Sequence, residues 1–171
     1  RPLEGAPKTC TVRRDGDQWF ASVLCEETVP DLALRTAPVV ALDRGIAHLF
    51  ATSDGRLAEN PRHLQKALKR LAHAQRVVSR RKNGSKNREK AKARVVRLNR
   101  KVRRQREHVL HVESARLAKN HGTVVIEKLN IAGMIQGHCA RSIADAGWSI
   151  FAEMLRYKLA WSGGTLIEVP A

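Results

Sequence analysis

The chain has 171 residues, with 32 Lys and Arg against 16 Asp and Glu, which gives a formal net charge of +16. This length suffices for one domain with a sizeable core, and no apolar run approaches the roughly 18 residues that a membrane span needs, so we expect no membrane partner. Cys10, Cys25 and Cys139 are scattered; they fit neither a disulfide framework nor a metal-binding spacing and suit a reducing compartment such as the cytoplasm.

A β-hairpin is predicted at the start of the chain. Residues 9–12 and 19–25 are β-rich runs that are joined across Asp15-Gly16, a dipeptide typical of tight hairpin turns. The hairpin is either the end of a preceding β domain or an isolated edge hairpin. Residues 26–38 hold two prolines and no clear period, which indicates a linker.

An antiparallel meander is predicted next. Residues 38–43 are a continuous apolar run that ends on Asp43, residues 47–52 are a second strand candidate, and residues 56–59 are a short third one. Near-continuous apolar strands are typically buried on both faces of a sheet, so we expect this for the first strand. Asp is rarely buried without a partner, so at Asp43 either the strand end is solvated or a cation lies beside it.

Two long helices follow. Asn60 and Pro61 suit the cap and the first position of a helix, and Asn83-Gly84-Ser85 interrupts the helical spacing. A second helix is predicted from about residue 87 to residue 120, near a C-cap at Gly122. The two helices would form an antiparallel hairpin. The second helix carries a narrow, coiled-coil-like seam of Val95, Leu98, Val102, Gln105, Val109 and Val112.

The remaining elements alternate between strand and helix. Residues 123–127 form a second β-branched run that ends on an acid, Glu127, and residues 130–137 look like a loop. Residues 142–161 have helical spacing, and residues 165–169 form a further strand. Strands that alternate with helices favour parallel pairing through crossover connections, so the fold class is α/β with a mixed sheet.

The two strand-end acids suggest a metal site. Neighbouring parallel strands lie about 4.8 Å apart, so Asp43 and Glu127 would emerge together at the carboxyl edge of the sheet, where α/β folds bind ligands. Paired carboxylates repel each other unless a cation intervenes, and hard oxygen ligands at a wet edge suit Mg²⁺ or Mn²⁺. Two such ions would support phosphodiester hydrolysis. Alternatively, each acid only marks a strand end or pairs with a Lys or Arg.

The excess positive charge lies in one block. Residues 61–106 hold 19 basic residues and one acid, Glu89, a net charge of +18. A charge run is usually a solvated helix face, but one with so few acids repels itself, which favours contact with the closely spaced phosphates of a nucleic acid. The candidate contacts are Lys66, Lys69, Arg70, Arg76, Arg80, Arg81, Lys82, Lys86, Arg88, Lys90, Lys92, Arg94, Arg97, Arg100, Lys101, Arg103 and Arg104.

Other candidates are weaker. His108 and His111 lie one helical turn apart and could share a metal, although the same spacing also suits a solvated face. His138 and Cys139 are adjacent rather than spaced for a metal, and Glu168 is a mid-strand candidate for a third acid. Some aromatic side chains could stack on bases, but their spacing fits core packing better; these are Trp19, Trp148, Tyr157 and Trp161.

Taken together, four motifs resemble the transposon-encoded TnpB (OrfB-type) proteins: LDRGIAHLFATSDG, NGSKN, VVIEKLNIAGM and ARSIADAGWSIFAEMLRYKLAWSG. The resemblance covers residues 39–169 in the family's order. It implies a RuvC-like nuclease domain with the RNase H fold, related to the type V CRISPR nucleases. Such proteins use a guide RNA to cut target DNA with Mg²⁺, and Asp43 and Glu127 match their first two catalytic carboxylates.

The resemblance also implies an organisation. Residues 1–37 would be the end of a β-rich wedge-type domain plus a linker, and residues 38–171 a truncated nuclease domain with the basic helical hairpin inserted at residues 61–120. The family's zinc-binding Cys cluster and its third acid, an Asp, would follow Ala171, so structural Zn²⁺ is expected only beyond this chain. Because both ends look cut, we expect a fragment, and because it lacks the third acid, we expect that fragment to be inactive alone. Ala41 stands where the family usually has Gly.

Two alternatives remain open. A non-catalytic basic module that binds nucleic acid would explain the helical hairpin but not the paired strand-end acids. A guide-free transposase or resolvase on the same fold would explain both features and would not bind a specific RNA.

Overall fold

The computed structural model describes residues 5–28, 33, 35–134, 136 and 139–170. The chain forms two compact units, one from residues 1–31 and 70–99 and the other from residues 32–69 and 100–171. Among the described residues, no helix has both the length and the apolar character that crossing a membrane requires.

The predicted β-hairpin is confirmed and is longer than expected. Strand β1 (Ala6–Asp15) pairs with β2 (Gln18–Glu26) in antiparallel register. Most of its side chains are exposed, so the hairpin has no core of its own. Trp19 is 67% exposed, and the guanidinium of Arg14 lies 5.9 Å from its ring. The expectation that Trp19 packs in a core was therefore wrong.

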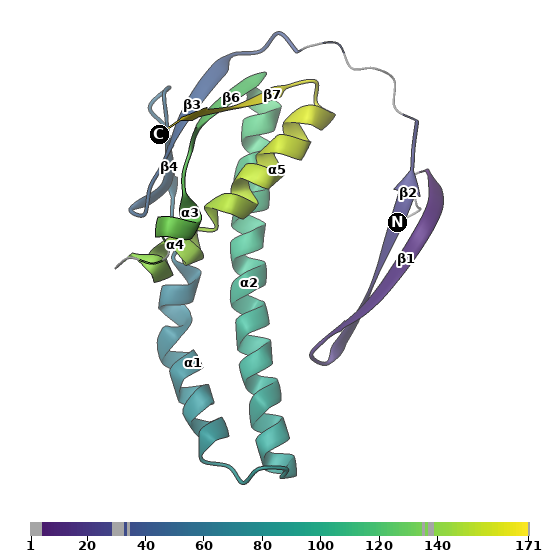
Figure 1. Ribbon diagram of the computed structural model, residues 1–171, viewed down its shortest axis with the longest axis vertical. Helices are drawn as coiled ribbons and strands as arrows, with labels where there is room; N and C mark the ends of the chain where they lie inside the picture. The colour runs from purple at the N-terminus through teal and green to yellow at the C-terminus, as the bar shows by residue number, and fades with distance from the viewer. Residues whose placement is uncertain (1–4, 29–32, 34, 135, 137–138, 171) are drawn as a thin grey trace. The chain divides into compact units, whose positions relative to one another are not determined.

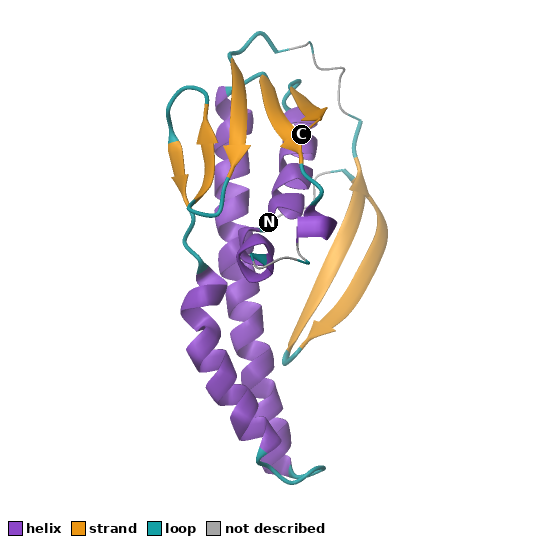
Figure 2. Cartoon of the chain, turned by 60° about the vertical axis from the view of Figure 1, so that its left-hand side comes forward, coloured by secondary structure: helices purple, strands orange, loops and turns teal. Residues whose placement is uncertain are grey.

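The helical hairpin is also confirmed. Helices α1 (His63–Ser79) and α2 (Lys86–Asn120) run antiparallel on either side of a short turn, as Figures 1 and 2 show. Near this turn, Nη1 of Arg88 donates to the carbonyls of Val78 and Arg81 at 3.3 and 3.0 Å. Arg88 thereby ties the start of α2 to the last turn of α1 and to the connection that follows it.

The second unit contains a five-stranded mixed sheet in the order β5-β4-β3-β6-β7. Strands β3 (Val39–Arg44), β4 (His48–Thr52) and β5 (Leu57–Glu59) form the predicted meander. Strands β6 (Thr123–Lys128) and β7 (Thr165–Pro170) continue the sheet, parallel to β3. The predicted α/β class and parallel crossovers are thus confirmed.

The core lies between one face of this sheet and two helices, α2 and α5 (Trp148–Trp161), which lie against that face (Figure 2). Phe50 of β4 and Phe151 of α5 stack with ring centroids 5.3 Å apart. The fully buried side chains include Val40, Phe50, Leu110, Leu117, Val124, Ile126, Phe151, Leu155 and Leu159.

Burial corrects the prediction for the first strand. Side chains of β3 alternate between exposed and buried, with Val39 67% exposed and Val40 1% exposed. The strand is apolar on both faces, but only the face toward α2 and α5 is covered among the described residues. A continuous apolar run indicates that both faces of a strand can be buried, but it does not indicate whether another element covers each face.

The predicted seam of α2 was wrong at two positions, whereas Val109 packs against the core as expected. Gln105 and Val112 are exposed, whereas Leu110, Ser114 and Leu117 are buried. In this stretch the helix packs against a sheet and α5, which requires a broader face than a coiled-coil seam. A heptad-like pattern that fits one partner helix therefore does not describe the whole of α2.

The single helix predicted over residues 142–161 is two helices, α4 (Ala140–Ala146) and α5. Gly147 ends α4 in the left-handed conformation at φ 67°, which a residue with a Cβ rarely adopts. The predicted loop 130–137 contains a short helix, α3 (Ile131–Met134); residues 135 and 137 lie outside the described residues.

Two predicted helix ends need correction. Helix α1 begins at His63 instead of Pro61, and the cap is the carboxylate of Asp145, which accepts from the N–H of Leu64 at 3.0 Å. Asn60 lies before this start: its Oδ1 accepts from the N–H of Arg62 at 3.2 Å, and its amide donates to the carbonyl of Ile46 at 2.9 Å. Gly122 is not a left-handed C-cap; a Cβ there would lie 2.6 Å from the carbonyl oxygen of Arg35, so the position requires glycine for close backbone approach.

Candidate functional site

The two strand-end acids emerge at the same edge of the sheet. In the parallel pair β3–β6, Leu42 is opposite Ile126, so Asp43 and Glu127 each follow the last paired residue of a neighbouring strand. Leu42 and Ile126 are buried toward the helices, and side chains alternate along a strand, so both acids belong to the opposite, uncovered face. Asp43 is exposed and Glu127 is half-buried.

A cation lies near this edge but does not pair with Asp43, because Arg44 alternates with Asp43 along β3 and shares the helix-covered face with Leu42. Nη2 of Arg44 donates to the backbone carbonyl of Glu127, which ties the end of β3 to the end of β6 beyond the paired residues. Burial lowers the pKa of Arg44, and the nearby charges of Glu168 and Glu127 partly oppose this shift. Because Arg44 binds the backbone carbonyl of Glu127, it does not occupy the carboxylate oxygens of Glu127.

The third candidate acid does not join the pair. Glu168 on β7 is opposite Ile126, so it shares the helix-covered side of the sheet instead of the side of Asp43 and Glu127. Its carboxylate pairs with Arg156 of α5, and Arg156 also pairs with Glu153 at 2.5 Å. Glu168 is therefore explained as a partner that fastens β7 to α5.

The donor set at the edge suits a hard divalent cation but is small. Mg²⁺ takes one or two carboxylates and completes its octahedral shell with waters and phosphate oxygens. Asp43 and Glu127, on one face of the sheet, can supply the two carboxylates. In the part of the chain that the structure describes, no group of three or more His, Cys, Asp or Glu side chains is arranged to hold a metal. His108 and His111 are exposed on α2, and His138 lies outside the described residues.

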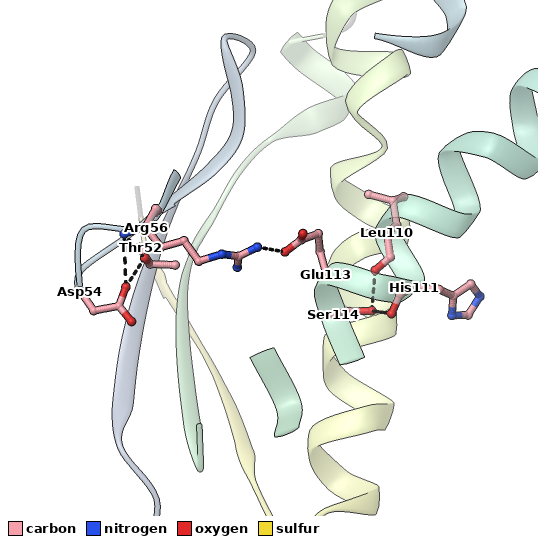
Figure 3. A network of polar contacts seen from close by, with 7 residues as sticks. All are labelled: Thr52, Asp54, Arg56, Leu110, His111, Glu113 and Ser114. Atoms are coloured by element: carbon pink, nitrogen blue, oxygen red, sulfur yellow. Dashed lines mark hydrogen bonds and ion pairs between the residues drawn. The ribbon is translucent and has the colours of Figure 1, made fainter. Parts of the chain in front are cut away.

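A polar network fixes the meander against α2. Arg56, after the β4–β5 turn, pairs with Glu113 of α2, and the N–H of Arg56 donates to Oγ1 of Thr52 at 2.9 Å (Figure 3). The guanidinium of Arg56 also lies 5.6 Å from the centre of the Phe50 ring. These contacts hold β4 in place and, through its pairing with β3, help to position Asp43.

The basic helical hairpin presents nearly all of its predicted contacts to solvent. Of the seventeen candidate cations, fifteen are exposed; the exceptions are Arg88, which binds the carbonyls of Val78 and Arg81, and Arg100, which is only 8% exposed. Lys92 pairs with Glu89, the single acid of the block, at 2.8 Å. The exposed set can therefore meet a line of phosphates, whereas Arg88 and Arg100 are less accessible to such a partner.

Sequence reasoning missed two sets of residues. The contact between Arg44 and the carbonyl of Glu127 joins residues 83 positions apart, and only the adjacency of Arg44 to Asp43 could have suggested it. Trp161 was assigned to a core face, but it is 75% exposed and packs edge-on against Tyr157 at 4.7 Å. No signal in the spacing distinguishes an exposed aromatic at the end of a helix from a buried one.

Comparison with known proteins gives a consistent family match. Residues 22–137 match the model of the OrfB_IS605 family, which is described as "Probable transposase". A Streptomyces pristinaespiralis protein is 43% identical over 99% of this chain, an Escherichia coli K12 protein 32% over 99%, and a Mycobacterium tuberculosis protein 36% over 92%. All three are named "Putative RNA-guided DNA endonuclease". The chain covers 43%, 46% and 37% of these relatives, respectively, which is less than half of each.

Proposed function

The chain belongs to the OrfB_IS605 family of probable transposases, and we propose that it is the RuvC-like, RNase H-fold nuclease portion of an RNA-guided DNA endonuclease. The observation that carries this proposal is the register of β3 and β6, which brings Asp43 and Glu127 to one edge and one face of the sheet. Relatives named as RNA-guided DNA endonucleases support the same activity.

In this proposal, Asp43 and Glu127 hold Mg²⁺ or Mn²⁺, which when bound lowers the pKa of a water and neutralises charge on the scissile phosphate. The carboxylate oxygens supply hard ligands from two strands whose spacing the sheet fixes. Arg44 sets the separation of the two strand ends through the carbonyl of Glu127. Arg56 and Glu113 support the neighbouring strand, so the ligand geometry depends on the whole meander.

The exposed cations of the helical hairpin hold the nucleic-acid backbone in this proposal. A protein of this kind contacts phosphates and helical shape, while base pairing with the guide RNA reads the target sequence. The partners are therefore a guide RNA and target DNA. The distribution of charge supports this role, since residues 61–106 carry a net +18 and almost all of their candidate contacts face solvent.

We also propose that this 171-residue chain does not cleave DNA alone. The resemblance to the TnpB proteins implies a third catalytic acid that this chain lacks, and the relatives extend well beyond the matched region. A third carboxylate and a structural zinc site would come from the remainder of the protein. Residues 1–37 would complete a wedge-type domain in that longer protein, and the whole would act on DNA in the prokaryotic cytoplasm.

The test of the catalytic assignment is Asp43→Ala in the full-length protein. We expect guide-dependent DNA cleavage to be lost while the protein still binds its RNA with unchanged affinity. Glu59→Ala is the matched control, because Glu59 is an exposed carboxylate at the end of β5 in the same sheet, and it should cleave normally. Normal cleavage by Asp43→Ala would refute the assignment.

A non-catalytic binding module is the second candidate, favoured by the absence of a three-ligand group among the described residues. Titration with Mn²⁺ separates the two: a nuclease portion should bind Mn²⁺ at a site that Glu127→Gln weakens, and a simple binder should not. A guide-free transposase is a third reading. Co-purification of one specific RNA with the full-length protein would exclude it.

A further inference from the structure

A groove on the second unit lies apart from the strand-end acids. It has a volume of about 480 Å³ and is lined by Arg35, Ala115, Ala118, Lys119, Tyr157, Lys158, Trp161 and Ser162. Helices α2 and α5 both end here, next to the starts of β6 and β7 (Figure 1). Asp43 and Glu127 lie at the other ends of the strands, about 20 Å away for six residues at roughly 3.3 Å each.

The groove carries an exposed aromatic platform. Trp161 is 75% exposed, which is unusual for the largest apolar side chain unless it serves a contact. Tyr157, one helical turn earlier, packs against it in an edge-on arrangement with centroids 4.7 Å apart. The indole is therefore supported on one side and open on the other, as a stacking surface needs to be.

Three cations, Arg35, Lys119 and Lys158, line the same groove as this platform, and no carboxylate lines it among the described residues. Arg35 donates to the carbonyl of Ala118 at 2.9 Å, and Lys158 donates to the carbonyl of His111 and to Oγ of Ser114, both at 2.7 Å. The two bonds of Lys158 use two of the three N–H donors of its ammonium group. They fix Lys158 in place and leave its third donor for an anion.

We propose that this groove binds unpaired nucleotides of a single-stranded nucleic acid, with a base stacked on Trp161 and its phosphate beside Lys158 and Lys119. A nucleotide supplies both a flat π face and a negative charge, so it satisfies both features of the groove. An apolar peptide would match the aromatic pair but leave the three cations unanswered. The inference does not rest on the nuclease assignment, because it concerns a different end of the sheet.

The test measures binding of short fluorescent oligonucleotides, oligo(U) and oligo(dT) of eight residues and a duplex of the same length, to the 171-residue chain. We expect Trp161→Ala to bind both single strands about tenfold more weakly, as for loss of one stacked base, while duplex binding changes little. Trp19→Ala is the matched control, since Trp19 is similarly exposed on β2, and it should bind like wild type. Trp161→Phe should retain most of the affinity.

Three further outcomes decide the proposal. Equal single-strand binding by wild type and Trp161→Ala would overturn it, and so would an equal loss for single strands and duplex, which would indicate electrostatics or misfolding. A loss confined to oligo(U) or to oligo(dT) supports it and identifies the sugar that is preferred. Asp43→Ala should leave oligonucleotide binding unchanged, and Trp161→Ala should leave Mn²⁺ binding unchanged, so this site and the proposed nuclease site can fail separately.

Discussion

Two segments of helix α2 show how differently one helix can use its surface. Residues 86–99, the tip segment, carry six Lys and Arg and contain no buried side chain. Residues 110–118, the sheet segment, carry a single cation, Arg116, and bury Leu110, Ser114, Leu117 and Ala118. The backbone conformation is the same in both, so the difference lies in what each segment contacts.

This difference separates stability from binding within one element. The sheet segment is apolar because it packs against β-strands and α5, and removing its side chains would open the core. The tip segment repels itself, because one acid, Glu89, offsets only one of its six Lys and Arg side chains. Because the cations of the tip segment repel each other and none of its side chains is buried, an anionic partner outside the chain best explains their concentration there.

The largest expected effect concerns the tip segment and salt. The affinity of the chain for nucleic acid should fall by about 10³ or more between 50 and 200 mM salt if six or more phosphates are contacted. Arg97→Gln should lower the slope of log affinity against log salt by roughly 0.7–0.9. Lys8→Gln, on β1 and paired with Glu26 at 2.6 Å, should leave it unchanged. A response to salt that is flat would contradict the assignment of the basic hairpin.

The next effect concerns the core. Phe151→Ala removes a fully buried ring that stacks on Phe50 and should lower the free energy of unfolding by about 3–5 kcal/mol. Leu98→Ala in the tip segment, where Leu98 is only half-buried, should lower it by much less. Urea denaturation followed by circular dichroism measures both. Equal losses would mean that the tip segment also has a tightly packed core.

Local patterns predicted the elements that depend on local rules. The Asp15-Gly16 turn, the break around Gly84 and the β-branched runs that end on Asp43 and Glu127 follow from turn chemistry and period. The parallel pairing of β3 and β6 followed from alternation of strands and helices. These local features are sufficient to predict that the two acids share one edge of the sheet.

Features that depend on long-range contacts could not be predicted in this way. The cap of α1 comes from Asp145, 81 residues away from Leu64, so a local reading chose Asn60 instead. The buried face of α2 changes along the helix because its neighbours change, and no single period describes it. The exposure of Trp161 depends on where α5 ends relative to α2, which spacing alone does not reveal.

A smaller effect tests the long-range cap. Asp145 is 8% exposed, and its carboxylate accepts from the N–H groups of Leu64 and Gln65 at the start of α1. Asp145→Ala should lower the free energy of unfolding by about 1–2 kcal/mol. Asp145→Asn should lose less, because one side-chain oxygen remains to accept a hydrogen bond. If the alanine variant were as stable as wild type, Asp145 would not be the cap in solution.

The smallest effect is a pH dependence at the same helix start. Burial lowers the pKa of His63 from its ordinary value of 6.5, opposed by the charge of Asp145 and assisted by that of Lys66. The unfolded chain therefore binds a proton on His63 more readily than the folded chain does. The contribution of His63 to the free energy of unfolding is complete above about pH 6.5, where the side chain is neutral in both states. This contribution is lost as the pH falls through the lower pKa of the folded state. The free energy of unfolding should therefore fall more between pH 7.5 and 5.5 for wild type than for His63→Asn, because the other titrating groups are shared. The same fall in both proteins would show that His63 remains solvated, and that the start of α1 is more open than its contacts with Asp145 imply.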